Sequence, residues 1–431
     1  METVTQRTTG WLTRALDLDS ADSLAAEVRA EFEIPPGVAY LDGNSLGLCC
    51  RSARSAALSA LADWGRLGVE GWLSAATPWF DLAETVAEQV APWVGAHPDE
   101  VAVGASTTVQ LHQLLATILP ARPERSVVVL DDLSFPSDSY AVAAQLSMRG
   151  FDPKRCIRRV PARDNGLVEE ADLIAALDDS VLAVLVPGVV YTTGQRMDLA
   201  RIAAAAHGVG ALMGADCSHS VGALPHRLHE WGIDFAVWCH YKYLNGGPGA
   251  PGGLFLHRRH HGIRPGLAGW WGSDKSRQFD MAPEMTPAAG AGALQIGTPS
   301  ILSLAAVAGA LELLNSVGVV RTRTRSLSLT RFMAEHARDA LAGLGFTQVT
   351  PEEDERRGGH LAFSHPEAAR ICRVLKREGV VPDFRPPNLI RLAPAPLYTT
   401  HEECARAIEL LADIVRSGRH LVEPGERERV A

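Results

Sequence analysis

Short apolar runs alternate with amphipathic segments between about residue 100 and residue 260. The runs that predict β-strands are VAVGA from Val101, VVVL from Val127, LAVLV from Leu182, ALMGA from Ala211, FAVW from Phe235 and GLFLH from Gly253. The segments that predict helices between them are Thr108–Ile118, Asp138–Met148, Glu169–Leu177 and Asp198–His207. Strands that are apolar throughout and joined by helices are typical of a mainly parallel sheet covered on both faces. The pattern therefore predicts an α/β fold whose ligands bind beyond the carboxyl ends of the strands.

Further elements are predicted on both sides of this core. A helix from Arg51 to Leu67 precedes it, a Gly- and Pro-rich crossing from Arg264 to Pro299 follows it, and a long helix begins near Ile301. The tail from about residue 330 alternates helix, strand, helix, strand and helix, which is typical of a smaller α+β lobe. We therefore expect an N-terminal arm and helix (1–60), a large domain (61–305) and a small C-terminal domain (306–431).

Composition and charge narrow the class of protein. The chain has 431 residues, is 46% hydrophobic and carries a formal net charge of −9, which predicts a large core and argues against nucleic acid or a membrane as partner. Its seven cysteines form an odd number without a CxxC pair, and its N-terminus lacks an apolar signal core, so we expect a cytoplasmic protein. No HExxH or CxxC motif points to a metal, and the basic run Arg258–His261 is interpreted as a solvated surface.

Two loops that follow predicted strands carry candidate binding residues. Ser106, Thr107 and Thr108 precede a helix, where hydroxyl groups either cap the helix or help its N-terminus to bind an anion. FPSD, from Phe135 to Asp138, follows the second strand. Its aromatic ring and proline either shape the turn, with the aspartate as helix cap, or the ring stacks on a flat ligand. Each loop by itself leaves both interpretations open.

The ends of two later strands carry a carboxylate and a lysine. Asp216 ends the strand in GADCSH, and a carboxylate at that depth needs a partner such as a protonated ring nitrogen. Lys242 lies in HYKYLNGGPG after the next strand. A lone lysine on a loop is usually a surface residue. If the lysine is buried, however, the pKa of its amine falls and the amine becomes a nucleophile for imine formation. A hydroxyl cluster, an aromatic loop, an aspartate and a lysine in this order together indicate a pyridoxal phosphate enzyme.

Several stretches of the chain resemble the kynureninase family. They are YLDGNSLGL (Tyr40–Leu48), FPSDSYA (Phe135–Ala141), GADCSHSVGALP (Gly214–Pro225), WGIDFAVWCHYKYLNGGPG (Trp231–Gly249), GWWG (Gly269–Gly272) and NLIRLAPAPLY (Asn388–Tyr398). The resemblance runs from about residue 38 to residue 400. It implies a fold-type-I pyridoxal phosphate enzyme: a mainly parallel central sheet with helices on both faces, and a smaller C-terminal α+β domain. The implied activity is hydrolysis of L-kynurenine to anthranilate and L-alanine in tryptophan degradation, by a homodimer with shared active sites.

The resemblance also assigns roles to the matching residues. Those that would bind the cofactor are Thr107, Thr108, Phe135, Asp138, Asp216, His219, Tyr241, Lys242, Trp270 and Thr298. Catalysis would depend on Lys242, which forms the imine, on Tyr241, which reaches the phosphate and relays protons, and on Asp216, which pairs with the ring nitrogen. Trp270 and Thr298 would come from the neighbouring subunit.

Three further residues would contact the substrate. Arg391 would bind the substrate carboxylate through two parallel N–H groups, and Ser45 would lie beside the substrate. Trp72 matches an aryl-pocket position that is aromatic in bacterial members of the family and histidine in the animal branch; otherwise it is a core aromatic residue. On the first interpretation we expect L-kynurenine to be preferred to 3-hydroxykynurenine.

One position departs from the family pattern, and alternatives follow. Pro187 stands before VVYTTGQ where the family usually has Ser or Thr, which removes a hydroxyl and a backbone donor.

One alternative function is that of a related hydrolase that cleaves 3-hydroxy- or ring-substituted kynurenines in secondary metabolism. A cysteine desulfurase-like enzyme would need a reactive cysteine, whereas Cys372 has the pattern of a buried residue. A non-catalytic cofactor-binding protein would not need Lys242 and Arg391.

Overall fold

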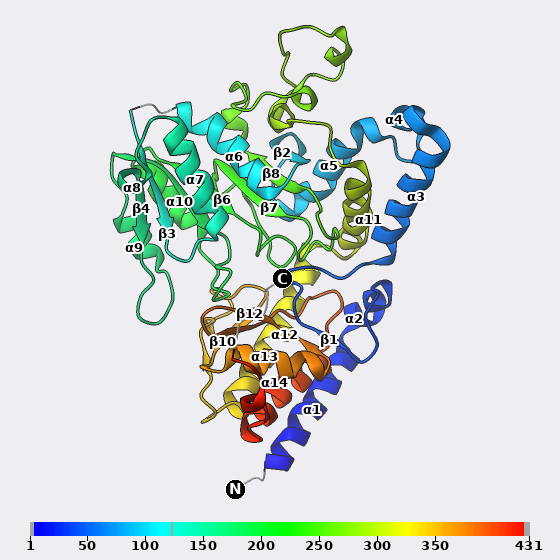
Figure 1. Ribbon diagram of the computed structural model, residues 1–431, viewed down its shortest axis with the longest axis vertical. Coiled ribbons are helices and arrows are strands. Elements are labelled where there is room, and N and C mark those ends of the chain that lie inside the picture. Colours follow the sequence, from blue (N-terminus) through cyan, green and yellow to red (C-terminus); the bar gives the residue numbers. More distant parts are fainter. Residues whose placement is uncertain (1–3, 122–123, 426–431) are drawn as a thin grey trace.

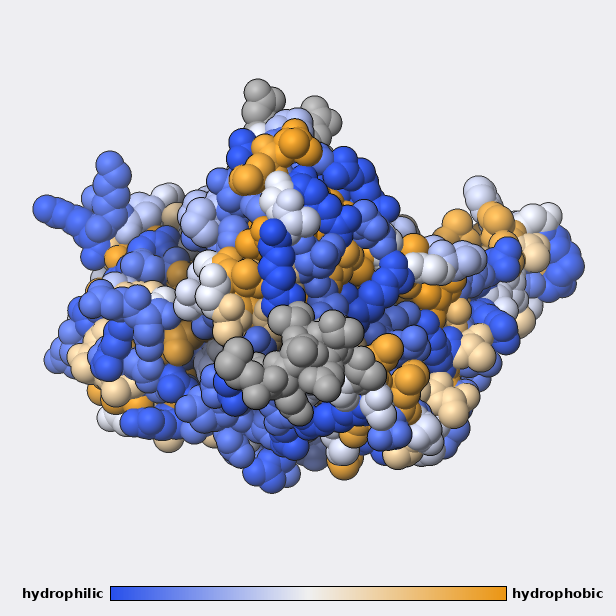
Figure 2. Space-filling model, turned by 90° about the horizontal axis from the view of Figure 1, so that it is seen from below, coloured by the Kyte–Doolittle hydropathy of each residue, from blue (hydrophilic) through white to orange (hydrophobic). Residues whose placement is uncertain are grey.

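The structure, a computed structural model, describes residues 4–121 and 124–425. Figure 1 shows a larger part with a central sheet above and a smaller part below, with α1 running along the smaller part. On the face seen in Figure 2, hydrophilic residues predominate and hydrophobic residues occur in separate groups. Among the described residues no single helix is long and apolar enough to cross a membrane. The pair Ile301–Val317 and Val319–Ala340 reaches the required length and composition only together, bent by 81°.

A seven-stranded sheet forms the centre of the larger part, in the order β2-β8-β7-β6-β5-β3-β4. Its strands are β2 (Val101–Gly104), β3 (Val127–Asp131), β4 (Ile157–Val160), β5 (Val181–Pro187), β6 (Leu212–Asp216), β7 (Phe235–Cys239) and β8 (Gly252–Leu256). The neighbours from β4 to β7 are parallel, whereas β8 is antiparallel to both β7 and β2. The prediction of a mainly parallel sheet is therefore confirmed.

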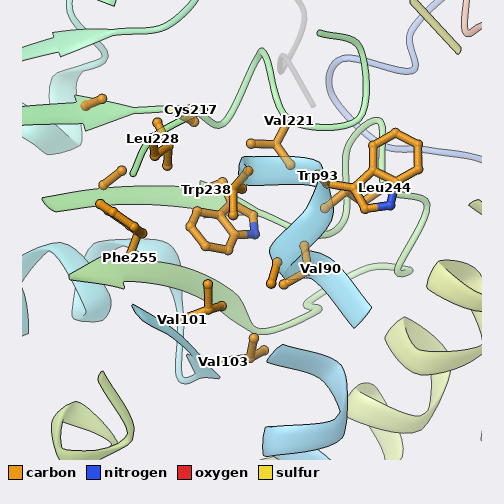
Figure 3. Close-up of a cluster of buried hydrophobic side chains, with 14 of the residues drawn as sticks. Val90, Trp93, Val101, Val103, Cys217, Val221, Leu228, Trp238, Leu244 and Phe255 are labelled. Atoms are coloured by element: carbon orange, nitrogen blue, oxygen red, sulfur yellow. The ribbon is translucent and has the colours of Figure 1, made fainter. Parts of the chain in front are cut away.

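Helices cover both faces of this sheet. The helices of the larger part are α3 (Arg51–Leu67), α4 (Gly71–Ser74), α5 (Leu82–Val94), α6 (Thr107–Ile118), α7 (Pro136–Met148), α8 (Pro153–Cys156), α9 (Glu170–Ala175), α10 (Leu199–Gly208) and α11 (Ile301–Val317). Neighbouring residues such as Val128 and Val129 belong to two different buried clusters, because successive side chains of a strand point to opposite faces. Figure 3 shows part of one cluster, where Trp93 of α5 lies near Trp238 of the sheet.

The smaller part is built around a four-stranded antiparallel sheet in the order β12-β13-β10-β9. Its elements are α12 (Val319–Ala340), β9 (Thr347–Gln348), β10 (Leu361–Ser364), α13 (Ala368–Arg377), β11 (Val380–Val381), β12 (Asp383–Arg385), β13 (Leu389–Leu392) and α14 (His401–Arg416). The N-terminal elements α1 (Val4–Ala21), α2 (Ser23–Val28) and β1 (Ala39–Tyr40) precede α3. β1 pairs with β11, and Ala15, Ala39 and Leu41 belong to the buried cluster of the smaller part.

Some elements were not predicted from the pattern. β4 has the sequence IRRV, which lacks an apolar run because it is the edge strand of the sheet, where charged side chains reach solvent. The helices α1 and α2 were also missed. The expected domain boundaries, 60/61 and 305/306, stay predictions. The helices α3 and α11 each run across one of them.

Candidate active site

The parallel strands β6 and β7 end side by side and bring Asp216 and Lys242 to one edge of the sheet. Asp216 is the last residue of β6, and Lys242 follows β7 by three residues; both are buried. Lys242 Nζ lies 3.4 Å from each ring nitrogen of His219 and 6.0 Å from the ring centroid of Phe135. The structure thus brings together the lysine, the carboxylate, the histidine and the aromatic ring that the sequence predicted.

The surroundings of Lys242 favour a neutral amine. Burial lowers the pKa of Lys242, and the positive charge of Arg391 acts in the same direction, against the opposing effects of Cys239 and Asp216. Burial and the charge of Lys242 also hold the pKa of His219 well below its usual range, so that its imidazole is neutral. A neutral lysine amine is the form that can act as a nucleophile or as a base.

Two carboxyl groups meet at the same edge. Burial and the charge of Asp216 raise the pKa of Asp138 well above its usual range, and the two side chains share a hydrogen bond. Asp138 therefore keeps its proton and donates a hydrogen bond to the Asp216 carboxyl group. Asp216 Oδ1 also accepts the backbone N–H of Ser218 at 2.8 Å. The pair is arranged to present the Asp216 carboxyl group to a cationic partner.

The predicted hydroxyl cluster lies at the start of α6. Ser106 is a helix cap, because its Oγ accepts the N–H of Val109 at 3.4 Å. Thr107 Oγ1 lies 3.1 Å from Cys239 Sγ, at the end of β7, while Thr108 is exposed. A β-carbon on Gly252 would lie 2.7 Å from the Thr107 nitrogen, so glycine keeps the helix N-terminus open. Free N–H groups and two hydroxyls at a helix N-terminus form a site that suits a phosphate.

Phe135 lies near Lys242, and Tyr191 packs against Phe135. Phe135 precedes α7, is 39% exposed, and its ring centroid lies 5.3 Å from that of Tyr191 in an edge-to-face arrangement. The Tyr191 ring also lies 6.1 Å from the His219 ring. An aromatic ring so placed has a face free for a flat ligand. Tyr191 was not predicted, because only its position beside His219 in space distinguishes it.

Arg391 of β13 connects the two parts of the molecule at this site. It is fully buried, its Nε donates to Asp383, and its Nη1 donates to the carbonyl of Tyr191 at 2.6 Å. Its Nη2 lies 3.4 Å from Ser45 Oγ, which is a long contact. Asp383 was not predicted from the sequence; it lies on the neighbouring strand β12, opposite Arg391.

Tyr241 directly precedes Lys242, and Pro187 ends β5 beside Asp216. Burial raises the pKa of Tyr241 above its ordinary value, and Cys239 adds to the effect, so that the phenol stays protonated. Pro187 pairs with Asp216 in the sheet, and the N–H of Gly188 donates to the Asp216 carbonyl at 2.8 Å. The backbone of Asp216 is therefore held although Pro187 has no N–H.

Trp72, Trp270 and Thr298 form a second group within the chain. They line a cavity of about 650 Å³ together with Phe80, Trp271, Lys275 and Phe279. The Trp72 ring lies 5.5 Å from the ring of Trp271. The residues that line this cavity do not include Lys242 or the residues around it. One chain by itself does not bring these three predicted site residues to the lysine.

Comparisons with known proteins agree with this geometry. Residues 322–411 match the family model described as the kynureninase C-terminal domain. Kynureninase of Geobacillus thermodenitrificans (strain NG80-2) is 47% identical over 417 residues, which cover 97% of both chains. Kynureninase of Bacillus anthracis is 44% identical over the same share of both chains.

Solved structures of lower identity share the fold. A mutant of the cystine C–S lyase C-DES with glycine covalently linked to its PLP cofactor has a TM-score of 0.77 at 19% identity, covering 89% of this chain and 99% of its own. The cysteine desulfurase of Thermococcus onnurineus NA1 has a TM-score of 0.75 at 15% identity, covering 91% of this chain and 98% of its own. At this identity the likeness shows the fold alone.

Proposed function

We propose that this chain, which belongs to the kynureninase family, hydrolyses the Cβ–Cγ bond of L-kynurenine to give anthranilate and L-alanine, with pyridoxal phosphate as cofactor. The observation that carries the proposal is the buried Lys242, whose amine has a lowered pKa and lies beside His219, at the same sheet edge as Asp216. The 47% identity over 97% of the chain identifies the reaction among those that this fold supports.

The residues at the sheet edge fit pyridoxal phosphate. The ring nitrogen of this cofactor needs an acidic partner, and Asp216 is the buried carboxyl group at this edge, hydrogen-bonded to Asp138. Its phosphate suits the start of α6 at Thr107 and Thr108, and its flat ring suits the free face of Phe135. When bound, pyridoxal phosphate supplies an electron sink for the negative charge that develops on the substrate.

Lys242 and Tyr241 are the groups that move protons. We infer that Lys242 Nζ holds the cofactor covalently and, once released, takes the α-proton of the substrate, for which its lowered pKa suits it. The Tyr241 phenol stays protonated and is our candidate donor during hydration of the carbonyl and release of alanine. An oriented acid or base of this kind contributes roughly 10²- to 10⁴-fold to the rate.

Arg391 and Ser45 form the candidate site for the substrate carboxylate. Nε and Nη1 of Arg391 are engaged by Asp383 and by the Tyr191 carbonyl. Nη2 makes only the long contact with Ser45, so this group is the one left to bind a carboxylate, with the serine hydroxyl beside it. Asp383 holds the guanidinium in this orientation.

We further propose a homodimer in which each chain completes the other's site. The cavity lined by Trp72, Trp270 and Thr298 lies apart from Lys242 and is bordered by strongly exposed apolar side chains. Val69 is 76% exposed, and Leu73 is 73% exposed. Exposed apolar groups of this size around a hollow are typical of a protein interface. A second copy placed there would add the aromatic wall of the cavity to the Lys242 site.

Location and rival functions depend on the cysteines. None of the seven, all of which lie in the described part of the chain, forms a disulfide, and six are buried, which fits a reducing cytoplasm; we propose that location. Cys372 is buried in the core of the smaller part, where a mobile sulfur carrier would not lie, so a desulfurase-like activity has no support beyond the shared fold. A related hydrolase acting on ring-substituted kynurenines is the remaining rival.

A product assay tests the proposed function. Purified holoenzyme should release anthranilate and L-alanine in equal amounts from L-kynurenine, and 3-hydroxykynurenine should be turned over less efficiently. Lys242→Ala is the matched control and should release neither product. Absence of anthranilate with fully loaded enzyme would contradict the proposal, while faster turnover of the hydroxylated substrate would favour the rival.

A further inference from the structure

Two histidines and a buried glutamate meet at a place that the proposed function does not use. The side chains of His97, Glu100 and His229 offer ligand atoms that all lie within 4.8 Å of one another. The Glu100 carboxylate is fully buried, whereas the His229 side chain is 32% exposed, so an ion has access from solvent. The imidazole rings of His97 and His229 lie 4.6 Å apart, nearly perpendicular at 80°.

This cluster and Lys242 lie at opposite ends of the strands of the sheet. Glu100 directly precedes β2, and Val101 at the start of β2 pairs with Phe255 near the end of the antiparallel strand β8. The end of β8 in turn pairs with Phe235, the first residue of β7. Lys242 follows the other end of β7. The cluster is therefore separate from the candidate active site.

The backbone holds the two histidines in place. The N–H of Leu228 donates to the carbonyl of Val94 at 3.0 Å, and the N–H of His229 donates to the carbonyl of Gly95 at 3.2 Å. Leu228 is buried and belongs to the same hydrophobic cluster as Trp93, part of which Figure 3 shows. Gly95 adopts φ +61°, and a β-carbon there would lie 2.2 Å from the carbonyl oxygen of His226, two residues before Leu228. The close approach that brings His229 to α5 thus requires glycine.

Hydrogen bonds hold Glu100 in one orientation. Its Oε2 accepts the N–H of His97 at 3.0 Å, and its Oε1 accepts the N–H of Arg258 at 2.9 Å and faces His229 Nδ1 at 2.7 Å. Partners of this kind fix a ligand group before an ion arrives.

The basic run is only partly the solvated surface that the sequence predicted. Arg258 Nη2 pairs with Asp99 at 2.8 Å, which offsets its charge close to the cluster. His257 stacks on His229 with ring centroids 4.7 Å apart, and so limits the positions that the His229 ring can take.

We propose that His97, Glu100 and His229 bind a divalent ion of the first transition row, with Zn²⁺ as the best match. Two imidazoles and one carboxylate form a donor set that Zn²⁺ accepts in tetrahedral geometry, with water in the fourth position. The ion would join the end of α5, the start of β2 and the loop before β7. Binding to the folded chain alone stabilises it, so the expected role is structural.

Zinc retention by the holoenzyme tests this proposal. After exposure to Zn²⁺ and dialysis, the unmodified protein should retain about one ion per chain and unfold at a higher temperature. The double variant His97→Ala with His229→Ala should bind Zn²⁺ more than about 100-fold more weakly, since loss of a partner that only orients a ligand already costs 10- to 100-fold. Its kcat/KM should be unchanged, because the cluster lies away from Lys242.

Matched controls come from the same edge of the sheet. His207 and His260 both face Asp234, at 2.9 Å and 2.6 Å, and the variants His207→Ala and His260→Ala should keep the zinc. Co²⁺ in place of Zn²⁺ should give the absorption of a tetrahedral site in the unmodified protein and lose it in the double variant. No retained zinc in the unmodified protein, or full retention in the double variant, would overturn the proposal.

Discussion

Asp138 and Asp216 share one hydrogen bond between their buried carboxyl groups, and the proton resides on Asp138. Two carboxylates this close cannot both ionise, so one of them becomes the donor and the other the anion. The pair places a buried carboxyl group where a ring nitrogen could meet it. It also predicts that the two residues respond differently to the same substitution.

Asp138→Asn should be tolerated, whereas Asp216→Asn should not. An amide at position 138 still donates to Asp216, so we expect kcat within about tenfold of the unmodified enzyme. An amide at position 216 removes the anion, and we expect kcat to fall about 10²-fold or more, as for loss of one preorganised electrostatic partner. Steady-state kinetics with L-kynurenine measure both, and Asp138→Leu tests whether the hydrogen bond itself matters. Equal losses in the two asparagine variants would contradict the assignment of the proton.

Asp42 should make stability depend on pH. Burial and the negative charge of Asp383 raise the pKa of Asp42 from 3.8 to about 6, so the folded chain binds this proton more tightly than the unfolded chain. Its contribution to the free energy of unfolding is complete below about pH 4 and is lost as the pH rises through about 6. Asp42→Asn removes this loss and should be more stable than the unmodified protein by up to about 3 kcal/mol at about pH 8.

Urea unfolding at two pH values measures this effect. The advantage of the Asp42→Asn protein should shrink as the pH is lowered to about 4, where the unmodified side chain is protonated in both states. A difference in unfolding free energy that is the same at both pH values would show that the substitution acts through packing and not through ionisation.

Mixed dimers should reveal whether Trp270 serves the partner's site. When Lys242→Ala chains are combined with Trp270→Ala chains, half of the dimers are hybrids, and each hybrid has one site with both native residues. We therefore expect about a quarter of the unmodified activity from two variants that are each weakly active. Combining Lys242→Ala with Asp216→Asn chains is the control, because both residues lie in one chain's site and no hybrid is complete. Equal activity in the two mixtures would show that Trp270 acts elsewhere.

Trp72 should set the preference between substrates. An aromatic wall offers no partner to the ring hydroxyl of 3-hydroxykynurenine, and burial of an unpaired hydroxyl costs about 1 to 3 kcal/mol. We expect kcat/KM to favour L-kynurenine by roughly tenfold to a hundredfold, and Trp72→His to narrow the gap. Kinetics of both enzymes on both substrates measure the ratio, with Trp72→Phe as the apolar control. An unchanged ratio in Trp72→His would leave Trp72 as a packing residue.

The local pattern of the sequence was enough to place the chemistry on the sheet. Apolar runs predicted six of the seven strands, and Asp216 and Lys242 were expected at one edge because parallel strands end on the same side. For the hydroxyl cluster the sequence left two interpretations open, and the structure shows that Ser106 is a helix cap. These features depend on residues close together in the chain, whose periodicity and turn chemistry are visible in the sequence.

Only the tertiary structure decided which distant residues meet. Asp383 orients Arg391, the Tyr191 carbonyl accepts from the same guanidinium, and neither contact follows from any spacing along the chain. Trp72 and Thr298, more than two hundred positions apart in the sequence, line one cavity away from Lys242. The reason is physical: side-chain contacts across a core depend on how helices and sheets pack. A local pattern records which face of an element is buried but not what it is buried against.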